Sequence, residues 1–185
     1  MDAISGLAIP ARPRLAELGA SLRDLRVDDA LLAAALPPDT GRPYGRRVLI
    51  QTPGLEGMIA CWNPGVPCAV HDHGGSVGAV RVLAGTGIHR QYTVADGALH
   101  LVAEDPVAPG DILVCGSTFV HAMESGQDEP MITLHLYGPT IPHMIVWDQE
   151  AGRTLKVSGG CGAWVPSEQE SDLLLEVREG LVPVW

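Results

Sequence analysis

The sequence predicts a mainly β protein, a sandwich or barrel of short strands preceded by short helices. Residues 45–148 contain about nine runs rich in Val, Ile and Leu, and turn signals such as Asp96-Gly97 and Pro109-Gly110 separate them. The composition agrees, because 22 Gly and 15 Pro are spread among 185 residues that include only 1 Phe. A chain of this length is long enough for one domain with a sizeable core.

The first predicted element is a pair of short helices within residues 14–36, with a scaffold role. Their apolar positions recur at helical spacing at Leu15, Leu18, Leu22 and Leu25. We expect a break near Val27, where Asp28 or Asp29 caps the second helix. Pro37 and Pro38 then end it.

The strand-like runs follow in order over residues 46–52, 55–62, 77–85, 87–94, 98–104, 111–116, 119–125, 131–138 and 143–148. The final stretch is mixed, and "SEQESDLLLEVREG" within it is compatible with a helix capped by Ser167. We therefore predict an N-terminal helical segment packed on the barrel (1–40), the barrel itself (41–165) and a C-terminal tail (166–185), all in a single domain.

Charge and composition exclude several function classes. The formal net charge of −10 repels phosphate backbones, so we expect no nucleic-acid partner. No apolar run approaches about 18–20 residues, and the first residues lack the order of a signal peptide, so we expect neither a membrane partner nor secretion. The four cysteines form no C-x-x-C pair, so we interpret them as reduced thiols of a cytoplasmic protein. Cys161, between glycines, is expected to be exposed.

The stretch "HDHGGSVG" (71–78) carries the first functional signal. On a strand, His71 and His73 point to the same face and Asp72 to the other, so the two imidazoles form a plausible metal chelate. The spacing from Gly65 through these histidines to Gly85 resembles the first motif of the cupin superfamily. The second motif of that family is matched in spacing by Gly110, Gly116, Thr118, His121 and Ser125. This resemblance implies a cupin (jelly-roll-like) β-barrel and makes His121 the third ligand.

Most metal-binding cupins carry a glutamate at the position of Gly78. Three neutral histidines leave a divalent ion with its full charge and with open positions. Such a site suits O2 together with an anionic ligand that chelates through two atoms, for which a thiolate with a neighbouring amine is appropriate. A small-molecule thiol is therefore the expected partner.

Four further segments narrow the resemblance. "YGR" (44–46), "CWNPGVPCAVHDHG" (61–74), "ITLHLYGPT" (132–140) and "WDQEAG" (147–152) resemble the cysteine dioxygenase family over roughly residues 40–160. The resemblance implies Fe(II) bound by His71, His73 and His121. It also implies a relay of Thr133, His135 and Tyr137, and a carboxylate clamp at Arg46, with adjacent Arg47 as the alternative. Tyr44 and His143 are further candidates for contact with the substrate.

The residues of the relay support this interpretation independently. Thr133, His135 and Tyr137 alternate along "TLHLY", so one face of one strand carries all three. A hydroxyl, an imidazole and a phenol in a row satisfy one another's hydrogen bonds. A satisfied core network without a catalytic part is the alternative. Trp62 is interpreted as pocket or core packing, and His89 and His100 as histidines of the barrel wall or surface.

Two departures from the family pattern matter. Mammalian members carry a cysteine at the position of Gly78 that crosslinks to the tyrosine, so Tyr137 is expected to stay a free phenol, as in bacterial members. Thr133 replaces a serine and keeps the hydroxyl. Related 3-mercaptopropionate dioxygenases usually carry Gln at the position of Arg46, so arginine favours L-cysteine as substrate.

The sequence thus predicts an iron(II)-dependent dioxygenase that converts L-cysteine into cysteine sulfinate, as a monomer or weak homodimer. The nearest alternative is a dioxygenase of another small thiol, such as 3-mercaptopropionate, or of a larger natural-product thiol. A metal-binding cupin without turnover, and a zinc or nickel cupin with isomerase or hydrolase chemistry, are the alternatives from other classes.

Overall fold

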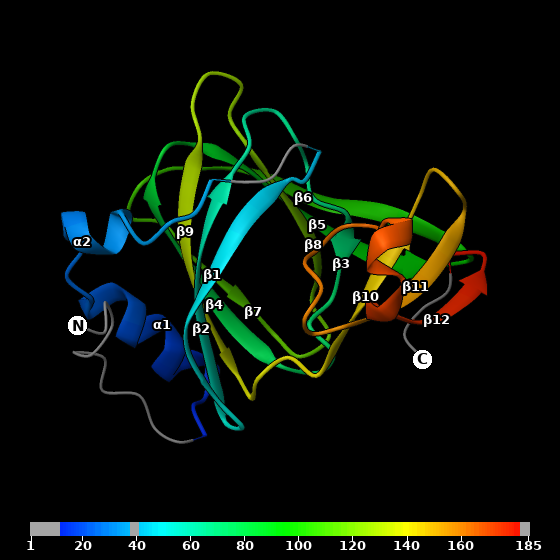
Figure 1. Cartoon of the computed structure of the whole chain (residues 1–185), viewed down its shortest axis with the longest axis horizontal. Helices are drawn as coiled ribbons and strands as arrows, with labels where there is room; N and C mark the ends of the chain where they lie inside the picture. Colours follow the sequence, from blue (N-terminus) through cyan, green and yellow to red (C-terminus); the bar gives the residue numbers. More distant parts are fainter. Residues whose placement is uncertain (1–11, 38–40, 182–185) are drawn as a thin grey trace.

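Two antiparallel sheets packed face to face form the body of the computed structural model, which describes residues 12–37 and 41–181 (Figure 1). The five-stranded sheet has the order β1-β2-β9-β4-β7. Its strands are β1 (Tyr44–Thr52), β2 (Leu55–Trp62), β9 (Met131–Gly138), β4 (Val77–Ala84) and β7 (Ile112–Cys115). The fold is therefore mainly β, as predicted.

The seven-stranded sheet has the order β12-β11-β10-β3-β8-β5-β6. Its strands are β12 (Leu174–Glu179), β11 (Arg153–Ser158), β10 (His143–Asp148), β3 (Val70–His71), β8 (Val120–Ser125), β5 (Gly87–Ala95) and β6 (Ala98–Val107). All the predicted strand-like runs form strands. The strand assumed for His71 and His73 corresponds to β3, which ends at His71, and the sequence did not predict β11 or β12.

The core between the sheets is built from the inward positions of both. Ala60 and Val80 from the first sheet pack with Met123, Ile145 and Trp147 from the second, and all five side chains are buried. Their burial removes apolar surface from water and holds the sheets together. The same inner faces carry the polar residues of the candidate site.

Helices α1 (Leu15–Asp24) and α2 (Asp29–Leu32) lie against the outside of the five-stranded sheet, as predicted (Figure 1). Leu18 and Leu22 of the predicted stripe are fully buried there. Asp28 caps α2, because its Oδ1 accepts a hydrogen bond of 2.9 Å from the backbone N–H of Leu31. Helix α2 ends before Pro37, and Pro38 lies outside the described residues. Among the described residues, no helix combines the length and apolar character needed to cross a membrane.

The C-terminal stretch differs from the predicted helix. Only Glu168–Leu173 is helical, as the 3-10 helix η1, and Ser167 donates through its N–H and its hydroxyl to Glu170. The next residues form β12, which pairs with β11. The alternation of Leu175 and Val177 with charged residues suits an edge strand better than a helix. The predicted division of the chain at residues 40 and 165 stays a prediction.

Candidate metal centre

The segment that carries the first two histidines is a very short strand followed by a turn. Strand β3 ends at His71, so His73 lies beyond the strand rather than on it. Asp72 fixes the turn, because its Oδ1 accepts hydrogen bonds from the backbone N–H groups of Ile145 (2.8 Å) and Gly74 (3.1 Å). Asp72 is therefore a buried structural residue.

Gly74 is required by this turn. Its φ is +58°, a conformation that favours glycine, and a Cβ there would lie 2.1 Å from the carbonyl oxygen of His143. The turn therefore packs closely against the start of β10 and returns His73 toward the barrel interior, next to His71.

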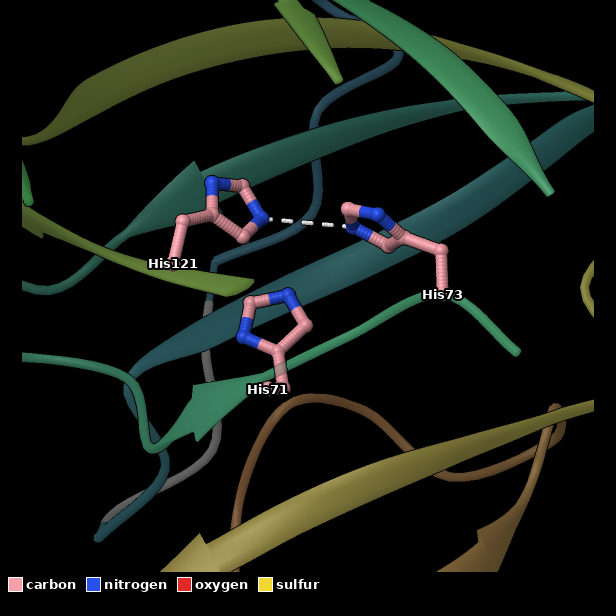
Figure 2. Close-up of side chains that lie close together, drawn as sticks. All are labelled: His71, His73 and His121. Carbon is pink, nitrogen blue, oxygen red and sulfur yellow. Dashed lines mark hydrogen bonds between the residues drawn. The ribbon is translucent and has the colours of Figure 1, made fainter. Parts of the chain in front are cut away.

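Three imidazoles converge between the sheets (Figure 2). His71 on β3 lies opposite His121 on β8 in the sheet register, and His73 approaches both from the turn. The ring centroids are 4.6 Å apart for His71 and His121, 4.9 Å for His73 and His121, and 5.2 Å for His71 and His73. Each ring offers one nitrogen within 4.8 Å of the others. The residues predicted as metal ligands thus form one group that could hold a metal ion.

The spacing of the nitrogens fits a metal ion. Nε2 of His73 and Nε2 of His121 are 3.2 Å apart. Two nitrogens bound to one ion at about 2.0–2.1 Å lie about 2.8–3.4 Å apart for angles between octahedral and tetrahedral. Burial keeps all three rings neutral, because it lowers the pKa of His71 to about 4 and the pKa values of His73 and His121 well below their ordinary value.

Neighbouring acceptors orient two of these rings. Nδ1 of His71 lies 2.9 Å from the carbonyl oxygen of Ala69, which only accepts, so Nδ1 carries the proton and Nε2 is free for a metal. Nδ1 of His121 lies 2.9 Å from Nε2 of His89. His89 therefore supports a candidate ligand, a role that its sequence context did not reveal. Nδ1 of His73 is buried and has no partner among the described residues.

A second polar group lies on the inner face of β9. Oγ1 of Thr133 is 2.7 Å from Nε2 of His135, and Nδ1 of His135 is 3.0 Å from the hydroxyl of Tyr137. The predicted alternation along the strand therefore produces one hydrogen-bonded chain. The chain is longer than predicted, because Trp62 on β2 donates its indole N–H to Oγ1 of Thr133 at 2.7 Å.

Gly78 explains the absent glutamate in steric terms. A Cβ at Gly78 would lie 2.6 Å from both Cδ1 and Cε1 of Tyr137, and these two residues are paired across β4 and β9. The phenol ring thus occupies the space that a side chain at position 78 would need. The ring also contacts the metal group, with its centroid 4.9 Å from that of His73. That Tyr137 remains a free phenol stays a prediction.

A small cavity of about 20 Å³ connects the two polar groups. It is lined by the three candidate ligands, by His135 and Tyr137, and by Tyr44 and Arg46 of β1. Met58, Trp62, Met123, Ile141 and Met144 complete its wall. Because this volume holds little more than one water molecule, a thiol can enter only if lining side chains move.

Arg46 is a lining side chain with room to move, because it borders open space on its outer side. It also lines an adjacent outer pocket of about 400 Å³, together with Tyr44. Its Nη2 donates to the carbonyl oxygens of Gly159 (3.3 Å) and Gly160. The hydroxyl of Tyr44 accepts the N–H of Ala163 at 2.7 Å. Arg47 is exposed and lines neither space, so the geometry favours Arg46 over Arg47 as a residue of the site.

A family model described as cysteine dioxygenase type I matches residues 39–150. The chain belongs to the cysteine dioxygenase type I family. The matched range contains the histidine group, the chain of hydrogen bonds on β9 and Arg46. The family and the three-histidine group together support a cupin thiol dioxygenase.

Solved structures share the fold at low sequence identity. An oxalate oxidase structure has a TM-score of 0.51 at 15% identity and covers 71% of this chain and 66% of its own. A protein of Thermus thermophilus has a TM-score of 0.50 at 19% identity, over 62% of this chain and 98% of its own. A Klebsiella pneumoniae protein with a double-stranded β-helix domain has a TM-score of 0.49 at 21% identity, over 60% and 84%. These likenesses concern the fold alone.

The predictions for His143 and for the cysteines have different outcomes in this member of the cysteine dioxygenase family. His143 begins β10 and packs near Gly74, but it is not among the residues that line the cavity. Cys161 was expected to be exposed, and this was wrong, because its side chain is fully buried and burial raises the pKa of its thiol to about 11. All four cysteines are free thiols, as predicted.

Proposed function

We propose that the protein is an iron(II)-dependent dioxygenase that adds both atoms of O2 to the sulfur of L-cysteine and releases cysteine sulfinate. The observation that carries the proposal is the group of three buried, neutral histidines beside an arginine and a tyrosine in one cavity. A carboxylate ligand is missing at position 78, so a bound ion keeps its charge for an anionic substrate.

The metal has a limited and definite part in the proposal. His71, His73 and His121 would hold it through imidazole nitrogens, and iron(II) would supply the redox chemistry that couples O2 to the thiol. The reaction balances without a further reductant. Sulfur loses four electrons, the two oxygen atoms gain four, and one thiol and one O2 give one sulfinate and one proton.

The side chains of the cavity orient the substrate. Arg46 exchanges its backbone carbonyl partners for the substrate carboxylate, which is a stronger, charge-assisted acceptor. Tyr44, whose hydroxyl lies at the same end of β1, accompanies Arg46 in this contact. Tyr137 presents its hydroxyl to the reacting end of the substrate from β9 of the same sheet.

The apolar wall completes the arrangement. Met58, Ile141 and Met144 are buried and line the cavity, so water is excluded once a substrate fills it. Exclusion of water strengthens the contacts of Arg46 and Tyr137 with a charged substrate. It also protects a reactive sulfur from side reactions.

The experiment is O2 uptake by purified protein loaded anaerobically with Fe(II), with L-cysteine, 3-mercaptopropionate and cysteamine in parallel. We expect rapid uptake with L-cysteine, one O2 per sulfinate, and two labelled oxygens in the product when 18O2 is supplied. Protein loaded with Zn(II) is the control and should consume no O2. O2 uptake only with another thiol would assign that thiol as the substrate in place of L-cysteine. The absence of O2 uptake by iron-loaded protein with any of the thiols would contradict the proposed function.

A further inference from the structure

Four side chains form one continuous chain of hydrogen bonds that ends at the cavity. Trp62 donates to Oγ1 of Thr133 at 2.7 Å, Oγ1 lies 2.7 Å from Nε2 of His135, and Nδ1 of His135 lies 3.0 Å from the hydroxyl of Tyr137. Each of the four is at most 4% exposed. Because all four side chains are buried, the protons of these three links are distributed among the four side chains themselves.

The first link determines the second. An indole N–H is only a donor, so Thr133 accepts from Trp62 and still has one hydroxyl proton to donate. Among the described residues, Nε2 of His135 is the acceptor within reach of that proton. If His135 donated instead, Thr133 would accept twice and its own buried proton would have no partner.

The third link follows from the second. Burial lowers the pKa of His135 to about 3, so the ring is neutral and carries a single proton. With Nε2 accepting, that proton is on Nδ1 and is donated to the oxygen of Tyr137. Because the phenol oxygen accepts on the side of His135, the hydroxyl proton of Tyr137 is directed away from His135. Tyr137 lines the cavity beside the three candidate ligands.

We propose that Trp62 is a positioning residue whose indole N–H sets the direction of this chain and makes the Tyr137 hydroxyl a hydrogen-bond donor toward the cavity. With the opposite direction, Tyr137 would donate to His135 and present only lone pairs to the substrate. The proposal rests on the proposed function only for the acceptor in the cavity, an anionic sulfur or oxygen atom of the thiol substrate or its sulfinate product.

The direct test is the tautomer of His135. Protein labelled with 15N-histidine and loaded with diamagnetic Zn(II) gives separate ring-nitrogen signals for each tautomer in long-range 1H–15N spectra, and the His135→Gln variant assigns the signals. We expect the Nδ1–H tautomer of His135 in the unsubstituted protein. An Nε2–H tautomer would overturn the proposal.

Three variants identify the origin of the direction. In Trp62→Phe we expect a mixture of His135 tautomers, because Thr133 can then accept from Nε2–H without losing a partner. Thr133→Val removes both this link and the link from Thr133 to His135 with almost no change of volume. It should also give a mixture of tautomers, so it serves if Trp62→Phe does not fold. Thr133→Ser keeps the hydroxyl and should keep the Nδ1–H form. An unchanged tautomer in folded Trp62→Phe, or in Thr133→Val where it replaces that variant, would refute the role of Trp62.

Turnover gives a second readout that mere packing would not reproduce. In Trp62→Phe and Thr133→Val, kcat should fall about 2- to 10-fold, which corresponds to one net hydrogen bond, while KM for L-cysteine stays within about twofold. Thr133→Ser, which keeps the hydroxyl, should keep kcat close to that of the unsubstituted protein. If no thiol is oxidised but the tautomers behave as expected, the proposed function fails and the direction of the chain stands.

Discussion

The contact between Gly78 and Tyr137 gives a quantitative prediction for the substitution Gly78→Ala. The added Cβ would lie 2.6 Å from two ring carbons of Tyr137, whereas ordinary contacts between carbon atoms begin at about 3.5 Å. The ring is only 2% exposed and cannot swing into solvent, so the ring or β4 must shift by about 1 Å. Overpacking of this kind costs about 1–3 kcal/mol.

The same shift threatens a hydrogen bond. The hydroxyl oxygen of Tyr137 lies 3.0 Å from Nδ1 of His135. A displacement of about 1 Å takes these two atoms beyond the range of a hydrogen bond. This loss adds about 1 kcal/mol to the destabilisation. For a chain of this length each kcal/mol lowers Tm by about 2–4 °C, so we expect Gly78→Ala to lower Tm by about 4–16 °C.

Gly116→Ala is the matched control, because no atom lies within 4 Å of its would-be Cβ and its φ is not in the left-handed region. We expect its Tm to be equal to or slightly above that of the unsubstituted protein. Both variants are measured by calorimetry at one pH, with metal removed by a chelator. A Tm for Gly78→Ala within about 1 °C of the control would refute the steric argument.

The remaining predictions concern the substrate clamp, the support of a ligand, and pH. Arg46→Ala should lower kcat/KM for L-cysteine about 10- to 100-fold, as expected for a charge-assisted hydrogen bond, with little effect on cysteamine, which lacks a carboxylate. Arg47→Ala, at the exposed neighbouring position, is the control. An equal loss of kcat/KM in Arg47→Ala would argue against Arg46 as the carboxylate clamp. His89→Leu should weaken metal binding about 10- to 100-fold in a chelator competition, while His89→Gln keeps an acceptor for the His121 N–H and should bind nearly normally. Equal affinities for the two variants would argue against this support. For pH, the pKa of His71 is lowered by burial from 6.5 to about 4. The unfolded chain therefore takes up this proton first, and the metal-free protein should lose about 3 kcal/mol of stability through this group as pH falls from 6.5 to 4. The free energy of unfolding in urea should depend less steeply on pH in His71→Gln than in the unsubstituted protein. Equal slopes in the two proteins would contradict this contribution of His71.

The sequence pattern was sufficient to predict features that depend only on residues a few positions apart. The alternation of Thr133, His135 and Tyr137 placed three side chains on one face because side chains along any strand alternate with a period of two. The same argument brought His71 and His73 together, although His73 lies past the end of β3 and reaches the site through a turn that Gly74 permits. The helical stripe of leucines and the cap at Asp28 were equally readable, because both depend on residues a few positions apart.

Side-chain contacts that depend on the pairing of strands could not be predicted from the sequence. His89 reaches His121 because β5 pairs with β8 in a register that sets Gln91 opposite His121 and therefore places His89 diagonally on the same face. Trp62 reaches Thr133 across β2 and β9 in the same way. The helix predicted in the C-terminal tail was wrong for a related reason, because Leu174–Glu179 forms a strand by pairing with β11, which is distant from the local pattern of the tail.

The sequence by itself determined the mainly β fold, the three histidines and the polar triplet of β9, and it indicated the family through short segments in fixed order. Only the tertiary structure decided which arginine lies at the cavity, which residues support the ligands, and why position 78 has no side chain. The physical reason is that each of these outcomes depends on the register between strands distant in sequence. That register is fixed by the packing of the whole core rather than by any neighbouring residues.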